Sequence, residues 1–353
     1  MTFMDEDLSQ LLLASSEPVE REWHIVLRPL NPDWMVRRTL LNLPRTLVDE
    51  NRFFEAQPPR VVYKLNTNPR QLVNVLESFN LYQDMLIQIQ RIDPTRFKTM
   101  HKGTPYYLMG WLSFAMKDYE KAVFFMDAAL SEDLTNDPNW ADSPASSFLM
   151  ISDDYERSAA PEIAIELRHE ADKMMRRFSH VSPSPITTHQ FVNQFIKPNA
   201  PDPAYRAIAT SFNTFALERK TRLQQIKIRS NSGGSIEPFL THIFKGTLIF
   251  ESVLKRKLRG SSLGQCLNNG CTQLGLSKAS WRTCKNVSLQ DIPAILERLK
   301  LEPFHERNIA VAFALRNTAG HDLGWTDIFK YQMYSKLVSA VENSILWSVK
   351  SLY

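Results

Sequence analysis

Residues 314–323 read Ala-Leu-Arg-Asn-Thr-Ala-Gly-His-Asp-Leu, and the interpretation of the chain starts from this stretch. It places Arg316, Asn317 and His321 close together in the sequence. On an α-helix Asn317 and His321 share a face, and the long Arg316 side chain can reach the same place. Gly320 weakens the helix just before His321. An apolar run precedes the stretch and an amphipathic run follows it, which predicts a helix on each side.

The three side chains suit chemistry on a phosphodiester. Histidine gains and loses a proton near neutral pH, because its ordinary pKa is about 6.5. Arginine presents a planar, permanently charged fork that matches phosphate oxygens, and asparagine can position a phosphate or an imidazole. The spacing alone leaves a second interpretation open. In that interpretation Arg316 and Asn317 are surface residues, Gly320 is a helix C-cap and His321 is placed by chance.

Three features, in this order, resemble the HEPN domain superfamily. The first is Phe250-Glu251-Ser252-Val253-Leu254-Lys255, similar to an acidic motif of the first core helix, and the second is the pair Leu263-Gly264. The third is Arg316, a polar residue after it and His321, which fits the R-x4-6-H motif of that superfamily. The resemblance covers residues 236–353 and implies a four- or five-helix bundle there.

Many HEPN domains are metal-independent endoribonucleases, so the resemblance implies that activity here. His321 would act as general base or acid, Arg316 would stabilise charge on the phosphoryl oxygens, and Asn317 would position the phosphate or the imidazole. Glu251 would hold Arg316 or His321 in place. The 2′-hydroxyl of RNA would attack the adjacent phosphorus and give a 2′,3′-cyclic phosphate, without metal or cofactor.

The same resemblance implies a homodimer, because HEPN domains pair so that two motifs face one cleft. The architecture resembles prokaryotic defence or toxin ribonucleases, with the N-terminal half binding a protein regulator. The alternative is a non-catalytic scaffold that binds protein or nucleotide and carries a vestigial motif.

Composition limits the other possibilities. The chain has 353 residues, 43% of them hydrophobic, and only 11 glycines, which favours an all-α fold. No apolar run reaches the ~18 residues of a membrane span, and the acidic N-terminus is unlike a signal peptide, so we expect a cytoplasmic protein. The three cysteines lack C-x-x-C spacing, and we expect reduced thiols: Cys266, Cys271 and Cys284. Walker A, Rossmann, zincin and nucleophile-elbow motifs are missing from the sequence.

The basic surplus of the chain lies with the motif. Residues 236–353 hold 15 Lys and Arg against 9 Asp and Glu, whereas the whole chain has a net charge of only +4. We expect the run Lys255, Arg256 and Lys257 to contact RNA, although a merely solvated basic face remains an alternative.

The rest of the chain is predicted to be helical in several parts. Residues 1–59 form a partly ordered N-terminal segment. Residues 60–180 form a helical region in which 105–138 resembles a tetratricopeptide repeat, and a plain helical bundle is the alternative. The repeat-like positions are Tyr106, Gly110, Tyr119, Ala122 and Ala129.

Residues 181–235 form a connection with two proline-rich breaks, a helix over 204–228 and a Ser/Gly linker at 230–235. The basic side chains of that helix are expected mainly on a solvated face, with phosphate contact as the alternative: Arg219, Lys220, Arg222, Lys227 and Arg229.

In the last domain we predict helices over 289–299, over 303–318 and from Asp327 onward. His242 and His305 are more typical of structural histidines than of proton carriers. Trp281 and Trp325 flank the motif, and core packing is favoured over stacking on a base.

Overall fold

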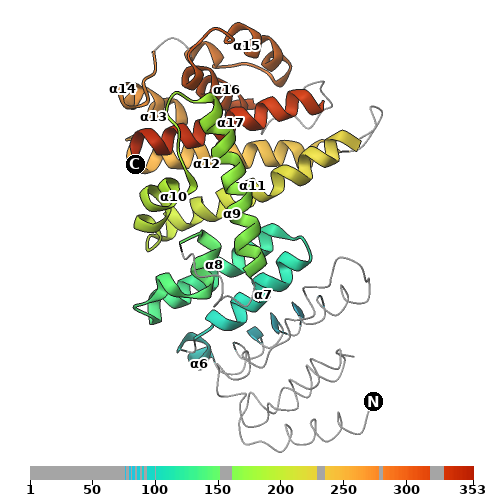
Figure 1. Cartoon of the computed structure of the whole chain (residues 1–353), viewed down its shortest axis with the longest axis vertical. Coiled ribbons are helices and arrows are strands. Elements are labelled where there is room, and N and C mark those ends of the chain that lie inside the picture. Colours follow the sequence, from blue (N-terminus) through green and yellow to red (C-terminus); the bar gives the residue numbers. More distant parts are fainter. Residues whose placement is uncertain are drawn as a thin grey trace, which may run out of the picture. The chain divides into compact units, whose positions relative to one another are not determined.

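A computed structural model describes residues 76, 79–80, 82–83, 86–87, 90, 94–99, 101–151, 161–228, 235–277, 281–318 and 330–353. All regular structure in these ranges is helical, with no strand among them, so the predicted all-α class is confirmed for this part of the chain (Figure 1). The predicted segment 1–59 lies outside the described residues. The chain divides into two compact units, Met1–Phe148 with Ser152–Ile163, and Leu149–Ile151 with Ala164–Tyr353.

The first unit contains a helical hairpin where the sequence predicted one. Helix α7 (Gly103–Ala115) is followed by a tight turn, in which Lys117 adopts a φ of 62°, and by α8 (Tyr119–Asn136). The two helices approach closely at Gly110, where a Cβ atom would lie 3.1 Å from the backbone oxygen of Ala122. Two small residues, Gly110 and Ala122, permit this close approach, while the resemblance to a tetratricopeptide repeat stays a prediction. The shorter helices are α6 (Pro94–Thr99), η2 (Trp140–Asp142) and η3 (Pro144–Leu149).

Helix α9 (Pro161–Val181) belongs to the second unit from Ala164 onward, and a proline-rich segment connects it to α11 (Pro203–Ile228). The two proline-rich breaks of this segment, at residues 182–185 and 197–203, were expected to leave little room for regular structure, but helical turns lie between them. Thr187 and Gln190 form a reciprocal capping box, which satisfies backbone N–H groups at the start of a helical stretch. That stretch comprises α10 (Thr188–Phe191), the π-helical turn η4 (Val192–Ile196) and the 3₁₀ turn η5 (Lys197–Asn199).

Three long helices form the core of the second unit together with α11. They are α12 (Glu237–Lys257), α16 (Phe304–Thr318) and α17 (Tyr331–Leu352). Residues 309–315 of α16 are buried on every face, as expected for a central helix. For α17 the sequence pattern also predicts one apolar stripe that includes Tyr331 and runs from Leu337 to Ile345. Its members from Leu337 onward are buried, whereas Tyr331 is exposed at the start of the helix. Shorter helices cap one side: α13 (Leu263–Asn269), α14 (Cys271–Leu274), η6 (Arg282–Cys284), η7 (Leu289–Asp291) and α15 (Ile292–Arg298).

Helix α12 packs against both α11 and α17, and a glycine makes this possible. A Cβ atom at Gly246 would lie 2.6 Å from a methyl group of Val341 and 2.7 Å from the ring of Phe215. Both distances are shorter than van der Waals contact, so only glycine fits between the three helices. The helices therefore belong to one compact unit, although the sequence suggested a domain boundary between α11 and α12. Most of the predicted linker, residues 230–234, lies outside the described residues.

A buried carboxylate joins three helices of the second unit. The Glu342 side chain on α17 is only 3% exposed, and its Oε1 lies 2.7 Å from Nε of Arg219 on α11. It also accepts hydrogen bonds from Nη2 of Arg177 on α9, at 3.1 Å and 3.3 Å. The expectation of a solvated basic face on α11 is therefore wrong for Arg219, whose side chain is 12% exposed and points into this cluster.

The described helices include none that is both long and apolar enough to cross a lipid bilayer.

Candidate functional site

Arg316 lies in the last turn of α16, which ends at Thr318 as the sequence predicted to within a residue. Its side chain is 29% exposed, so the guanidinium lies at the edge of the unit and not in its core. Asn317 follows on the exposed side of the helix. His321, Gly320 and Trp325 lie outside the described residues.

The guanidinium of Arg316 is held by Glu251 of α12. Nε of Arg316 donates a hydrogen bond of 2.7 Å to Oε2 of Glu251. The other carboxylate oxygen lies 2.6 Å from Nζ of Lys255, one helical turn further along α12. The acidic residue singled out on the first core helix is thus in contact with the arginine of the motif, while the catalytic roles of both stay predictions.

The two cations keep Glu251 ionised. Burial by itself raises the pKa of this carboxyl, but the hydrogen bonds from Lys255 and Arg316 outweigh burial and hold the pKa below its ordinary value. The carboxylate is therefore a fixed negative charge at neutral pH, which can orient the guanidinium of Arg316.

Arg316 also stacks over Phe244, with Cζ 5.0 Å from the centre of the ring. Such cation–π contact favours a fixed orientation of the guanidinium plane. Within the described ranges, the Nη1 and Nη2 groups of Arg316 have no protein acceptor, because the hydrogen bond and ion pair to Glu251 both use Nε. Two parallel N–H donors remain for a phosphate.

A groove of about 720 Å³, here called the α11–α12 groove, runs beside this pair. Its floor is apolar and includes Ile208 and Leu248, and its basic side chains are Lys245, Lys255 and Arg256. Because Phe244 lines the groove and also lies under Arg316, the guanidinium is only one side chain away from it.

The three residues predicted to bind RNA differ in their surroundings. Lys255 lines the α11–α12 groove and is paired with Glu251. Arg256 also lines it and lies over the ring of Tyr205 at 5.7 Å. Lys257 is not part of the lining and lies over the ring of Tyr353 at 4.4 Å.

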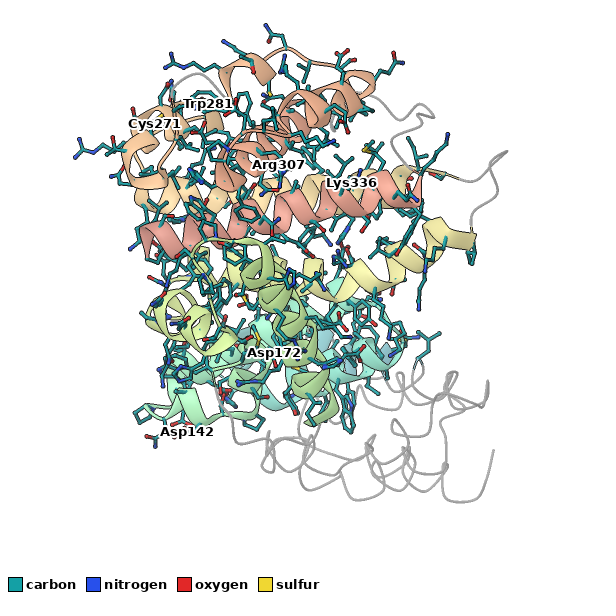
Figure 2. The ribbon with its side chains drawn as sticks, turned by 45° about the horizontal axis from the view of Figure 1, so that its top comes forward. Asp142, Asp172, Cys271, Trp281, Arg307 and Lys336 are labelled. Atoms are coloured by element: carbon teal, nitrogen blue, oxygen red, sulfur yellow. The ribbon has the colours of Figure 1, made fainter. Side chains whose placement is uncertain are left out.

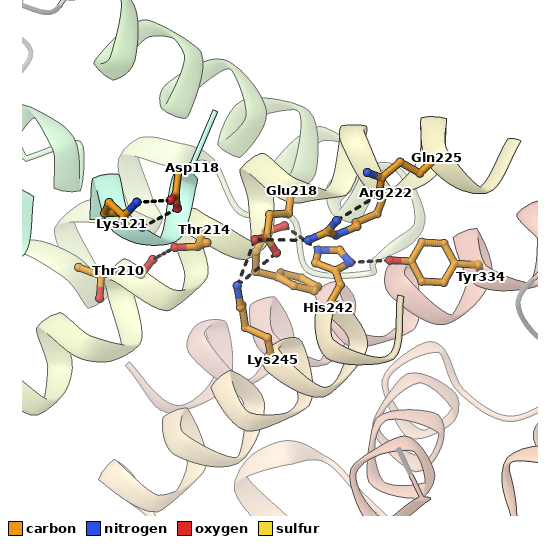
Figure 3. Close-up of polar contacts among 11 residues, drawn as sticks. Asp118, Lys121, Thr210, Thr214, Glu218, Arg222, Gln225, His242, Lys245 and Tyr334 are labelled. Atoms are coloured by element: carbon orange, nitrogen blue, oxygen red, sulfur yellow. Dashed lines mark hydrogen bonds and ion pairs between the residues drawn. The ribbon is translucent and has the colours of Figure 1, made fainter. Parts of the chain in front are cut away.

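Sequence reasoning missed Lys245 and Phe244. Lys245 contacts Glu218 of α11 at 3.2 Å and 3.3 Å and thereby spans the two helices of the groove (Figure 3). Glu218 in turn lies 3.9 Å from Nη2 of Arg222. The spacing of Lys245, ten residues before the basic run, gives no signal in the sequence, because the contact joins two helices.

His242 is a structural residue. It is buried between Tyr334, whose hydroxyl lies 2.7 Å from Nδ1, and the carbonyl oxygen of Phe215, 2.9 Å from Nε2 (Figure 3). The carbonyl can only accept, so Nε2 carries the proton and Nδ1 accepts from Tyr334. Burial lowers the pKa of His242 to about 3, which leaves the ring neutral.

The remaining side chains considered from the sequence also pack. His305 donates a hydrogen bond of 2.8 Å from Nε2 to the carbonyl oxygen of Gly275, and its ring stacks on Trp347. Trp281 is buried against Phe313. The three cysteines are buried free thiols. Among the described residues no group of three His, Cys, Asp or Glu side chains could hold a metal ion.

Comparison with known proteins found no matching family model, no matching curated protein and no matching solved structure.

Proposed function

We propose that the chain is a metal-independent endoribonuclease of HEPN type. The observation that carries the proposal is the contact of Arg316 with Glu251 beside a groove with basic side chains. This contact fixes the guanidinium through Nε, and its Nη groups have no acceptor among the described residues. A negative phosphodiester is the ligand that such an arrangement favours.

In the proposed reaction RNA lies along the α11–α12 groove with one phosphate at Arg316. The 2′-oxygen forms a bond to phosphorus while the bond from phosphorus to the 5′-oxygen breaks. His321 takes the proton of the 2′-hydroxyl, and the 5′-oxygen receives a proton as it leaves. Arg316 stabilises the charge on the phosphoryl oxygens, and Asn317 positions the phosphate or the imidazole.

A single motif histidine in each chain serves poorly as both acid and base. The proposal therefore includes a homodimer in which each chain supplies His321 to a shared cleft. The helical region before residue 180 would bind a protein that regulates cleavage, in a prokaryotic defence or toxin setting.

The test uses the full chain, an end-labelled single-stranded RNA and a structured RNA, both in excess EDTA. We expect cleavage to 2′,3′-cyclic phosphate ends, reduced by about 100-fold or more in Arg316→Ala and in His321→Ala. Arg176→Ala is the matched control, because Arg176 is exposed on α9 and lies outside the α11–α12 groove. Failure of the wild type to cleave either RNA, or equal cleavage by both variants, would overturn the proposal.

A second candidate function is a non-catalytic scaffold. It is favoured by the engagement of Arg316 with both Glu251 and Phe244, since a purely structural ion pair also accounts for these contacts. Expression in bacteria distinguishes the two. Toxicity that His321→Ala relieves supports the nuclease, whereas equal growth of both strains without RNA breakdown supports the scaffold.

A further inference from the structure

A second groove, here called the α9–α17 groove, lies in the same unit and takes no part in the proposed ribonuclease. It has a volume of about 650 Å³ and is lined by side chains from α9, α16, α17 and the end of α15. This volume is typical of sites for small molecules.

Cations from four different elements meet in this groove. Arg177 comes from α9, Lys300 follows α15, Arg307 is on α16 and Lys336 is on α17, and His180 adds an imidazole. Figure 2 shows Arg307 and Lys336 on two helices of the bundle. Convergence from four separate elements differs from a run of basic residues on one solvated helix face.

The carboxylates in the lining leave most of this charge uncompensated. Glu342 is already shared between Arg177 and Arg219. Glu297 is 72% exposed and pairs at 3.6 Å only with Lys300, so the pair is worth little in water. A positive surplus therefore remains in the groove.

Two of the cations are unpaired among the residues that the structure describes. In the part of the chain that the structure describes, the side chains of Arg307 and Lys336 have no hydrogen-bond or ion-pair partner. Nε of Arg177 is likewise buried without a hydrogen-bond partner there. A buried N–H group without an acceptor is costly, so an acceptor supplied by a ligand would stabilise it.

The remaining lining offers an apolar wall and amide groups. Leu296, Phe304 and Val311 form the wall. Nδ2 of Asn343 donates to Oδ1 of Asn308 at 3.4 Å, which leaves Oδ1 of Asn343 as an acceptor beside the wall. An aromatic ring and aliphatic groups can cover the flat face of a base, and amides can bond to its edge.

We infer that the α9–α17 groove binds a small nucleotide with at least two phosphoryl charges. The phosphates lie among Arg177, Arg307 and Lys336, and the base lies against the wall formed by Phe304. The inference does not rest on the proposed ribonuclease, because none of the residues assigned to RNA cleavage lines this groove.

The test is titration calorimetry of the full chain with ATP, ADP, GTP and GDP, in 150 mM salt with and without Mg²⁺. We expect a dissociation constant in the micromolar range for at least one nucleotide. Arg307→Gln and Lys336→Gln should each weaken binding about tenfold, since each removes a charge-assisted contact. Arg176→Gln, which removes an exposed cation of α9 outside the groove, should leave affinity unchanged.

Three further ligands make the result specific: adenosine, pyrophosphate and a single-stranded RNA oligonucleotide. Pyrophosphate that binds as tightly as the nucleotides would overturn the nucleotide assignment. So would binding of RNA alone, absence of binding by every nucleotide, or equal affinity of wild type and both groove variants. The side chains of Arg307 and Lys336 have no hydrogen-bond or ion-pair partner in the described part of the fold, so matching urea midpoints are expected for these variants. Arg316→Ala should bind nucleotide normally, which separates this site from the ribonuclease.

Discussion

Acid should destabilise the second unit through His242, because the folded protein does not accept a proton on this ring. The unfolded chain protonates the imidazole near its ordinary pKa of 6.5, whereas the folded state does so only near pH 3. Between these values the unfolded state binds more protons, so stability falls as the pH falls. Burial is the main cause, and the nearby cations Arg222, Lys245 and Arg219 act in the same direction.

The magnitude follows from the pKa difference. One pKa unit corresponds to about 1.4 kcal/mol, so the change from 6.5 to about 3 amounts to about 5 kcal/mol across the whole window. As the pH falls from about 6 to about 4, protonation of His242 in the unfolded state should lower the unfolding free energy of the wild type by about 1.4 kcal/mol per pH unit. His242→Gln keeps a donor for the oxygen of Phe215 and an acceptor for Tyr334 but cannot titrate, so its pH dependence should be shallower by that amount.

The assay is urea unfolding followed by tryptophan fluorescence at several pH values, for wild type and His242→Gln. The difference in unfolding free energy between the two proteins at each pH gives the contribution of His242 alone, because all other titrating groups are shared. Nuclear magnetic resonance of ¹⁵N-histidine provides a direct check, with protonated Nε2 and bare Nδ1 expected at pH 5. Parallel stability curves for the two proteins, or a His242 resonance that titrates with a midpoint above pH 5, would refute the assignment.

Gly246→Ala should lower the unfolding free energy by about 1–3 kcal/mol despite the better helix propensity of alanine, since the new methyl group meets two neighbouring helices at less than 3 Å; a higher urea midpoint would contradict this. Glu342→Ala should cost about 3–5 kcal/mol by leaving the mostly buried Arg219 without its carboxylate, and Glu342→Gln should cost less in the same measurement; equal loss in both variants would show that the charge is unimportant. Glu251 has a pKa held below its ordinary value of 4.5, so its ionised form stabilises the fold above that pH and the effect is lost as the pH falls further. Glu251→Gln should therefore reduce stability at pH 7 and flatten the acid limb of the stability curve below about pH 5, and an unchanged acid limb would contradict the ion-pair account.

Much of the helical structure could be predicted from local sequence. Helix α11 begins at Pro203, where a proline fits the first turn, and the apolar run before Arg316 predicted α16 almost to the residue. The proline-rich segment before α11 was mispredicted because its prolines outweighed the capping box at Thr187. A local signal was present there, since Gln190 follows Thr187 at the spacing of that motif.

Contacts between distant segments could not be predicted in the same way. Arg177 and Glu342 are 165 positions apart, and nothing in either helix indicates the other. The contact between Glu251 and Arg316 was suggested only by the family resemblance, whereas the groove beside it depends on how α11 packs on α12. The α9–α17 groove has no sequence signature for the same reason.

The shared carboxylate of Glu342 limits how the chain can be divided. A fragment that starts at residue 236 would retain Glu342 and His242 but lose Arg177, Arg219 and the carbonyl of Phe215. The fragment would thus expose apolar surface that α11 normally covers, and Glu342 would remain buried without its two arginine partners. The shortest piece able to fold by itself must include α9 and α11, so any exchange of this module between proteins has to transfer about half of the chain and not only its last third.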